Sequence, residues 1–175
     1  MSWPVLVGER MTLRPPTDAD AAPLLDILSE PEVSRWWVGY TPQRIRDEIL
    51  EPGHALVMDI DGSCAGAILL YPNDDPEYLH VVIHLFLGAQ WYGQRFGAEA
   101  LAIVITHLAA LGHHRFTLDP NVHNAPAIRS YERLGFRAVG VLREFQLRPE
   151  GSHEDGLLMD LVMSDFPGGV DWRRG

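Results

Sequence analysis

The chain has 175 residues, 46% hydrophobic and 22% charged, a composition typical of one globular domain rather than of a disordered chain. Its formal net charge of −10 argues against nucleic acid as the main partner and is compatible with a cationic substrate. The single cysteine, Cys64, excludes a disulfide within the chain and fits a reducing compartment.

The ends and the apolar stretches of the sequence predict the cellular location of the protein. No secretory signal is visible at the start, and the most apolar helical stretch, 98–111, is too short to span a bilayer. We therefore expect a cytoplasmic protein without a membrane partner. We also expect a single domain over residues 1–175, with a core of about 9–166 and a tail over 167–175.

One strand and three helices are predicted in the first third. Residues 11–14 alternate in polarity as a strand does, and Thr17 then begins a helix with acidic residues in its first turn. Pro31 begins a short second helix that ends in the pair Trp36–Trp37. Thr41–Pro42 is a capping signal for a third helix.

The middle of the chain changes to the two-residue period of strands. Residues 54–60 and 63–71 are predicted to form a hairpin around Asp61–Gly62, and residues 78–87 to form a long strand. From 96 to 111 the apolar residues recur at helical spacing, which predicts a helix with Leu111 as the last residue of its buried face.

The last third predicts a strand at 115–118, a helix capped by Asn124, and two strands at 136–147 and 156–162. The whole order predicts an α/β (α+β) fold. Its mixed, mostly antiparallel sheet of about six to seven strands would be flanked by helices.

A glycine-rich turn joins the long strand to the long helix. The segment LGAQWYGQRFGAEAL, 87–101, holds Gly88, Gly93 and Gly97. N–H groups at a helix start lack partners within the helix and carry partial positive charge, so this turn is typical of an anion site. A P-loop is excluded because Gln94–Arg95 replaces its Lys-Ser/Thr pair, and the dinucleotide fingerprint GxGxxG is absent.

Two segments resemble the GNAT acyltransferase superfamily. Residues 92–98, YGQRFGA, resemble its pyrophosphate loop, which typically reads [QR]xxGxG followed by Ala or Thr. Gly97 matches the final glycine, whereas Arg95 replaces the middle glycine and Tyr92 the first Gln or Arg. Residues 119–136, DPNVHNAPAIRSYERLGF, resemble the superfamily's strand end, Asn, helix, Tyr and Gly-Phe. The resemblance covers nearly the whole chain.

The resemblance implies that acetyl-CoA, or another acyl-CoA, is held by a splayed strand pair and that its acyl group passes directly to an amine without a metal. The residues that it implies for the acyl donor are Tyr92, Gly93, Gln94, Arg95, Phe96, Gly97 and Ala98 at the pyrophosphate, and Leu85, Phe86, Leu87, Asn124 and Ala127 at the pantetheine arm. Tyr131 would protonate the departing thiolate. Without the motif around it, Tyr131 would be interpreted as a core aromatic.

Within the superfamily the chain is most like the aminoglycoside 6′-N-acetyltransferases. Three segments carry this resemblance, VSRWW at 33–37, TLDP at 117–120 and HEDGLLM at 153–159. It implies that Asp119 and Asp155 meet ammonium groups of the acceptor, and that Trp37 stacks on a sugar ring, with Trp36 beside it at the acceptor. The alternatives are that Asp119 caps a turn, that Asp155–Gly156 is a hairpin turn, and that the tryptophans belong to the core.

His84 departs from that family, which would have an aspartate at this place on the long strand. His84, directly or through water with Asp119, would take the proton of the ammonium group. A histidine paired with an aspartate also resembles the siderophore lysine N-acyltransferases, and a buried structural histidine is a further alternative. His80 shares the face of His84, but no third ligand for a metal is evident.

The leading hypothesis is therefore an acetyl-CoA-dependent N-acetyltransferase that acts on a small cationic amine, most like the 6′-amine of an aminoglycoside, as a monomer or homodimer. Two alternatives keep the chemistry and change the acceptor to a siderophore lysine or to a protein N-terminus of the ribosomal-protein type. A third alternative is a non-catalytic CoA-binding module.

Overall fold

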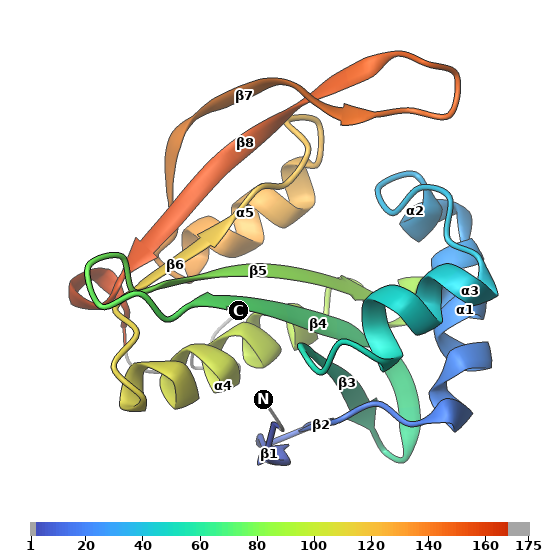
Figure 1. The fold of residues 1–175 in the computed structure, drawn as a ribbon, viewed down its shortest axis with the longest axis horizontal. Coiled ribbons are helices and arrows are strands. Elements are labelled where there is room, and N and C mark those ends of the chain that lie inside the picture. The colour runs from blue at the N-terminus through green and yellow to red at the C-terminus, as the bar shows by residue number, and fades with distance from the viewer. Residues whose placement is uncertain (1–2, 168–175) are drawn as a thin grey trace. The chain divides into compact units, whose positions relative to one another are not determined.

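The computed structural model describes residues 3–167 (Figure 1), so nearly all of the predicted tail lies outside the described residues. The described chain forms two compact units. The first contains residues 3–70 and 85–103, and the second contains residues 71–84 and 104–167. None of the helices among residues 3–167 has the length and apolarity needed to cross a lipid bilayer.

The predicted mixed α/β fold is confirmed. Eight strands follow the order β1-β2-β3-β4-β5-β6-β8-β7, with a parallel β5–β6 pair, and helices flank the sheet. The strands are β1 Leu6–Val7, β2 Thr12–Arg14, β3 Ala55–Ile60, β4 Ser63–Asn73, β5 His80–Leu87, β6 Arg115–Leu118, β7 Arg137–Leu147 and β8 His153–Val162. The helices are α1 Ala21–Ser29, α2 Pro31–Ser34, α3 Pro42–Ile45, α4 Phe96–Ala110 and α5 Ala125–Arg133.

Three expectations need correction. The sheet has one strand more than the six to seven predicted, because β1 is only two residues long and has no period to detect. The second helix ends at Ser34, so the tryptophan pair follows the helix. Leu111, expected on the buried face of the long helix, lies beyond its last residue and is 61% exposed.

In the first unit, α1, α2 and α3 gather beside β3 (Figure 1). Leu24, Ile27 and Leu28 recur at three- and four-residue spacing, which places them on one face of α1. They pack with Val33 of α2 and Ile45 of α3 in a buried cluster. Burial of each such side chain contributes about 2 kcal/mol of hydrophobic free energy.

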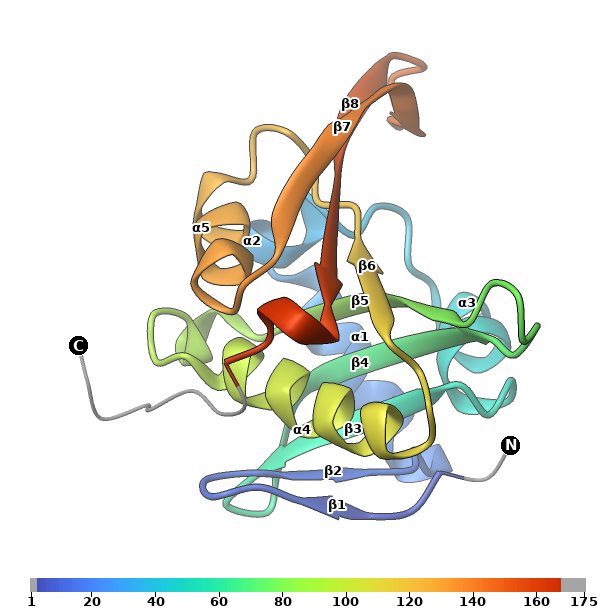
Figure 2. The ribbon, with the colours of Figure 1, turned by 90° about the vertical axis from the view of Figure 1, so that its left-hand side faces the viewer.

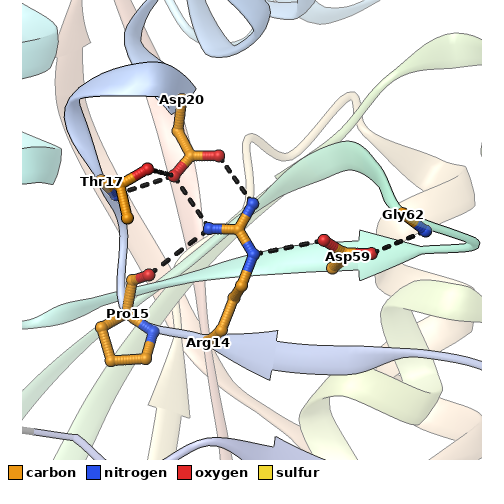
Figure 3. Close-up of polar contacts among 6 residues, drawn as sticks. All are labelled: Arg14, Pro15, Thr17, Asp20, Asp59 and Gly62. Atoms are coloured by element: carbon orange, nitrogen blue, oxygen red, sulfur yellow. Dashed lines mark hydrogen bonds and ion pairs between the residues drawn. The ribbon is translucent and has the colours of Figure 1, made fainter.

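Arg14 joins three elements of this unit (Figure 3). Its Nη1 and Nη2 donate to the two carboxylate oxygens of Asp20, at 2.9 and 2.7 Å, and its Nε donates to Asp59 Oδ2 at 3.2 Å. Asp20 also accepts the N–H of Thr17, which caps the first helical turn. The network therefore connects β2, β3 and the start of the α1 region.

A close approach between β4 and the end of β5 fixes the start of the glycine-rich turn. Gly66 has a φ of +152°, and a Cβ built on it would lie 2.1 Å from the carbonyl oxygen of Phe86. Next to it, the Gly88 N–H donates to the Ala65 carbonyl at 2.9 Å. Only glycine leaves room for this contact.

In the second unit, β7 and β8 form a long hairpin with α5 beside it (Figure 2). β8 begins at His153, earlier than predicted, and the turn before it lies around Gly151. The alternative that Asp155–Gly156 forms a hairpin turn is therefore wrong, since both residues lie within β8. Gly112 has a φ of +101° just after α4, as the end of that helix requires.

Asp20→Asn is expected to destabilise the protein by about 2–3 kcal/mol at pH 7, because it leaves Arg14 without a charged partner for its two terminal nitrogens. The hydrogen bonds from Arg14 hold the pKa of Asp20 below its ordinary value of 3.8. A carboxyl group whose pKa is lowered by folding stabilises the fold above that value and loses this contribution as the pH falls.

Urea unfolding from pH 7 downwards measures this difference, which should shrink as the pH falls below 3.8. Asp18→Asn is the matched control, because that side chain is 91% exposed. A difference between wild type and Asp20→Asn that stays constant through this range would contradict the account.

Gly66→Ala is expected to cost about 3 kcal/mol of unfolding free energy, because the new methyl group forces the end of β5 away from β4. Gly62→Ala provides the control. Gly62 lies in the turn of the same hairpin with a φ of +76° and open space around it, so its substitution should cost only about 1 kcal/mol. Equal losses in the two variants, measured by urea unfolding, would show that crowding at Phe86 is unimportant.

Candidate active site

The turn between β5 and α4 is fixed in the first unit before the helix begins. Glu30, at the junction of α1 and α2, accepts the Ala89 N–H on its Oε2 at 2.6 Å. A short 3₁₀ segment, Ala89–Trp91, follows, and the Gln94 side chain donates to the Gln90 carbonyl at 2.9 Å. The chain therefore reaches the predicted anion site in a fixed conformation.

Two left-handed residues bring the chain into α4. Gly93 has a φ of +74° and Arg95 a φ of +67°. The Arg95 carbonyl accepts the Glu99 N–H at 3.0 Å, so the helix starts directly after Arg95. The N–H groups of the first helical residues, from Phe96 onward, have no acceptor within the helix, and the helix dipole adds partial positive charge there. This is the backbone arrangement that binds phosphate groups.

Arg95 explains why the loop departs from the motif in sequence. It occupies the place of the motif's middle glycine, and its backbone adopts the left-handed conformation that glycine favours. An arginine in that conformation costs about 1 kcal/mol. Arg95 therefore adopts a backbone conformation that a glycine at this place would adopt without strain, although the side chain differs.

Tyr92 lies where the motif has Gln or Arg, and its side chain is 47% exposed. Partial burial and the nearby carboxylates of Glu30 and Glu32 raise the pKa of the Tyr92 phenol. Tyr92 is therefore neutral at physiological pH and provides no positive charge to the loop.

His84 and Asp119 face each other in the second unit. The Nε2 atom of His84 lies 3.4 Å from Oδ1 of Asp119, and the Tyr71 ring lies 5.4 Å from the imidazole. The two side chains follow the parallel β5–β6 pairs Val81–Phe116 and Val82–Thr117. The structure thus brings together two of the residues predicted to be catalytic.

The alternation of burial along β5 changes phase beside His84. Val81 and Ile83 are buried, and the next fully buried side chain is Phe86 rather than a residue of the same parity. One extra residue between Ile83 and Phe86 is typical of a β-bulge, which bends a strand away from its neighbour.

The segment after Asp119 is held against β8. The Pro120 carbonyl accepts the Leu157 N–H at 2.8 Å, and the Val122 N–H donates to the Asp155 carbonyl at 3.1 Å. Asn121, which is buried, donates to the Glu154 carboxylate, to which Arg148 also binds. The hydrogen bond from Arg148 lowers the pKa of Glu154, so this carboxylate stays charged.

Asn124 and Tyr131 lie at the start and near the end of α5. The Asn124 side chain accepts the Ala127 N–H at 3.3 Å, which confirms the predicted helix cap. Tyr131 is half-buried, and its ring lies 6.1 Å from that of Phe136. The roles assigned to Asn124, Ala127 and Tyr131 toward a ligand stay predictions.

Three of the residues expected at the acceptor have structural partners. The Trp37 ring lies edge-on to Phe86, with centroids 4.8 Å apart, and packs against the buried cluster of the first unit. The Asp155 carboxylate accepts the N–H of Glu144, a residue with a φ of +54°, at 2.8 Å. The guanidinium carbon of Arg35 lies over the Trp36 ring, 4.6 Å from the ring centroid.

Between residues 3 and 167 no group of three or more His, Cys, Asp or Glu side chains has the arrangement of a metal site. The residues that sequence reasoning missed are those that hold the loop from a distance in sequence. They are Glu30, Arg10 and Glu99, and none of them belongs to a local motif.

Comparison with known proteins agrees with this architecture. An N-acetyltransferase of Bacillus licheniformis named p20, described as uncharacterized, is 27% identical over 93% of this chain and 98% of its own length. RimJ of Mycobacterium smegmatis, solved with a CoA disulfide, has a TM-score of 0.74 and 22% identity, covering 94% of this chain and 88% of that one. AAC(6′)-Ib, solved with parmomycin and acetyl-CoA, has a TM-score of 0.72 and 22% identity. The match covers 93% of this chain and 99% of that one.

The family model for the acetyltransferase (GNAT) domain matches residues 10–137. That span includes β2–β6, the whole turn into α4, the His84–Asp119 pair and α5. Members of this family are enzymes that transfer an acetyl group and use acetyl-CoA. The chain belongs to the GNAT family of acetyltransferases.

Proposed function

We propose that this acetyltransferase moves an acetyl group from acetyl-CoA to a primary amine on a small cationic acceptor, of the type of an aminoglycoside 6′-amine. The observation that carries the assignment of an amine as the acceptor is the pair formed by His84 Nε2 and Asp119 Oδ1, 3.4 Å apart. In such a pair the carboxylate attracts an ammonium group, and the imidazole is a base that can accept the ammonium proton.

The donor is proposed to bind with its pyrophosphate on the backbone of residues 92–98. The left-handed residues Gly93 and Arg95 and the start of α4 fit that role, since they present N–H groups to an anion. The pantetheine arm is proposed to lie along the backbone of residues 85–87 and on Asn124 and Ala127. When bound, acetyl-CoA supplies an activated thioester.

Side chains of this protein accept and donate the protons during the acetyl transfer. The His84–Asp119 pair takes a proton from the ammonium group, which gives a neutral amine. The amine nitrogen forms a bond to the acetyl carbon as the carbon–sulfur bond breaks, and Tyr131 Oη provides a proton to the sulfur. The second proton of the nitrogen leaves to solvent, from which Tyr131 recovers its own.

A second candidate acceptor is the α-amine of a protein N-terminus. It is favoured by the packing of Trp37 against Phe86 and by the bond from Glu144 to Asp155, because these contacts occupy two groups that a sugar acceptor would use. A protein acceptor needs the His84–Asp119 pair but neither of the other two.

Free-thiol release from acetyl-CoA, measured against a panel of amines, separates the candidates. The panel contains kanamycin-type aminoglycosides, their 6′-hydroxyl analogues, lysine derivatives and N-terminal peptides. Turnover on 6′-amines and its loss on the 6′-hydroxyl analogues supports the first candidate. An absence of turnover on every aminoglycoside, together with turnover on peptides, would overturn the first candidate in favour of the second.

His84→Gln is expected to lower kcat/KM for the amine by about 100-fold and to remove the fall in rate at low pH, because a glutamine cannot accept the ammonium proton. Initial rates between pH 5.5 and 9 measure this effect. His80→Gln is the matched control, since His80 lies on the same strand and its Nδ1 is 2.6 Å from the Tyr78 carbonyl. An unchanged pH profile in His84→Gln would mean that another group is the base.

Tyr131→Phe is expected to lower kcat by about 100-fold and to leave the affinity for CoA unchanged, because it removes only the phenolic hydroxyl. Single-turnover rates and calorimetric titration with CoA measure the two quantities. Tyr78→Phe, at a tyrosine that is 64% exposed, is the control. Full turnover in Tyr131→Phe would remove this residue as the acid.

A further inference from the structure

Arg10 reaches from the turn between β1 and β2 to the start of α4. Its backbone N–H and its Nε donate to the two carboxylate oxygens of Glu99, each at 2.8 Å. Its Nη1 donates to the Gln94 carbonyl at 3.0 Å, and its guanidinium lies 4.3 Å from the centre of the Phe96 ring. One side chain thus contacts the glycine-rich turn and the first turn of the helix together.

The contact with the Gln94 carbonyl determines the direction of an N–H group. The Gln94 carbonyl and the Arg95 N–H belong to one peptide plane, and in a trans peptide they point in opposite directions. Because Arg10 holds the carbonyl oxygen on its own side, the Arg95 N–H points away from Arg10. That N–H belongs to the second of the two left-handed residues, Gly93 and Arg95, where the anion is proposed to bind.

The contact with Glu99 neutralises a negative charge in the first turn of α4. The Glu99 side chain is 1% exposed and lies in the first turn of α4. An uncompensated carboxylate there would oppose an incoming anion, and Arg10 neutralises it by an ion pair with two matched hydrogen bonds.

We propose that Arg10 is a positioning residue for the acyl donor, which orients the Arg95 N–H toward the pyrophosphate and neutralises Glu99 beneath it. This inference rests on the proposed function of residues 92–98. Arg10 acts through Glu99 and Gln94, which accept its hydrogen bonds, and it is assigned no contact with the donor.

Arg14 provides a matched control within the same hairpin. It lies four residues further along, and its guanidinium also binds a buried carboxylate, that of Asp20 (Figure 3). Its partners Asp20, Asp59 and Pro15 all lie outside the turn of residues 88–95. Loss of either network is expected to lower stability, but only loss of the Arg10 network is expected to change donor recognition.

The test compares acetyl-CoA with acetyl-pantetheine, a donor that has the same thioester and no pyrophosphate. The double variant Arg10→Met/Glu99→Gln removes both charges together, so that no buried charge is left without a partner. We expect its KM for acetyl-CoA to rise about tenfold, the effect of losing one well-aligned hydrogen bond to a charged group. Its kcat/KM for acetyl-pantetheine should stay that of the wild type.

Two further variants make the result interpretable if the double variant folds poorly. Arg10→Lys keeps the charge beside Glu99 and loses the planar fork, and it should give a smaller rise in KM for acetyl-CoA. Arg14→Met/Asp20→Asn should lower the melting temperature and leave the ratio of kcat/KM between the two donors unchanged.

Four outcomes would overturn the inference. An equal loss with both donors in the Arg10 variants would make Arg10 merely structural, and unchanged kinetics would remove its role altogether. A change of the donor ratio in the Arg14 control would show that instability alone produces the effect. A wild type that uses acetyl-pantetheine as well as acetyl-CoA would overturn the pyrophosphate site itself, and this outcome is visible without any substitution.

Discussion

The start of α4 is the constraint on which the account of donor binding depends. The backbone must leave β5, turn through two left-handed residues and present its first N–H groups to an anion. Gly66 allows β4 to approach the Phe86 carbonyl, Glu30 holds the Ala89 N–H, and Arg10 holds the Gln94 carbonyl. A backbone site of this kind works only when its N–H groups point inward before the ligand arrives, because the cost of ordering them would otherwise reduce the affinity.

The second unit contains the groups that are proposed to act on protons. The parallel pairing of β5 with β6 places His84 opposite Asp119, and the contacts of residues 120–122 with β8 keep that aspartate in place. A pair of this kind attracts any ammonium group and does not by itself choose among acceptors. Selectivity for the acceptor must therefore come from groups around the pair. The resemblance proposed Trp37 and Asp155 for that role, and both have structural contacts, Trp37 with Phe86 and Asp155 with Glu144.

Local signals in the sequence predicted most of the fold. The helical period of residues 96–111 predicted α4, and Asp61–Gly62, both left-handed, predicted the β3–β4 hairpin. β1 was missed because two residues have no period. The Asp155–Gly156 alternative was wrong because a short polar dipeptide fits both a turn and the interior of a strand beside a bulge.

The candidate site was only partly accessible to sequence reasoning. The motif placed the loop, but it treated Arg95 as a departure, whereas the backbone at Arg95 has a left-handed conformation that glycine adopts readily. A pattern of side chains does not record backbone angles. The contacts from Arg10 to Glu99 and from Glu30 to Ala89 join residues 89 and 59 positions apart, and no local pattern indicates such pairs.

The central claim is that the backbone of residues 93–98 binds the pyrophosphate of the donor. Amide chemical shifts of the isotope-labelled protein during titration with CoA test it most directly, with pantetheine as the reference ligand. The account predicts that CoA shifts the amides of residues 93–98 strongly and that pantetheine leaves them in place. Amides of residues 93–98 that do not respond to CoA, or that respond equally to pantetheine, would contradict it.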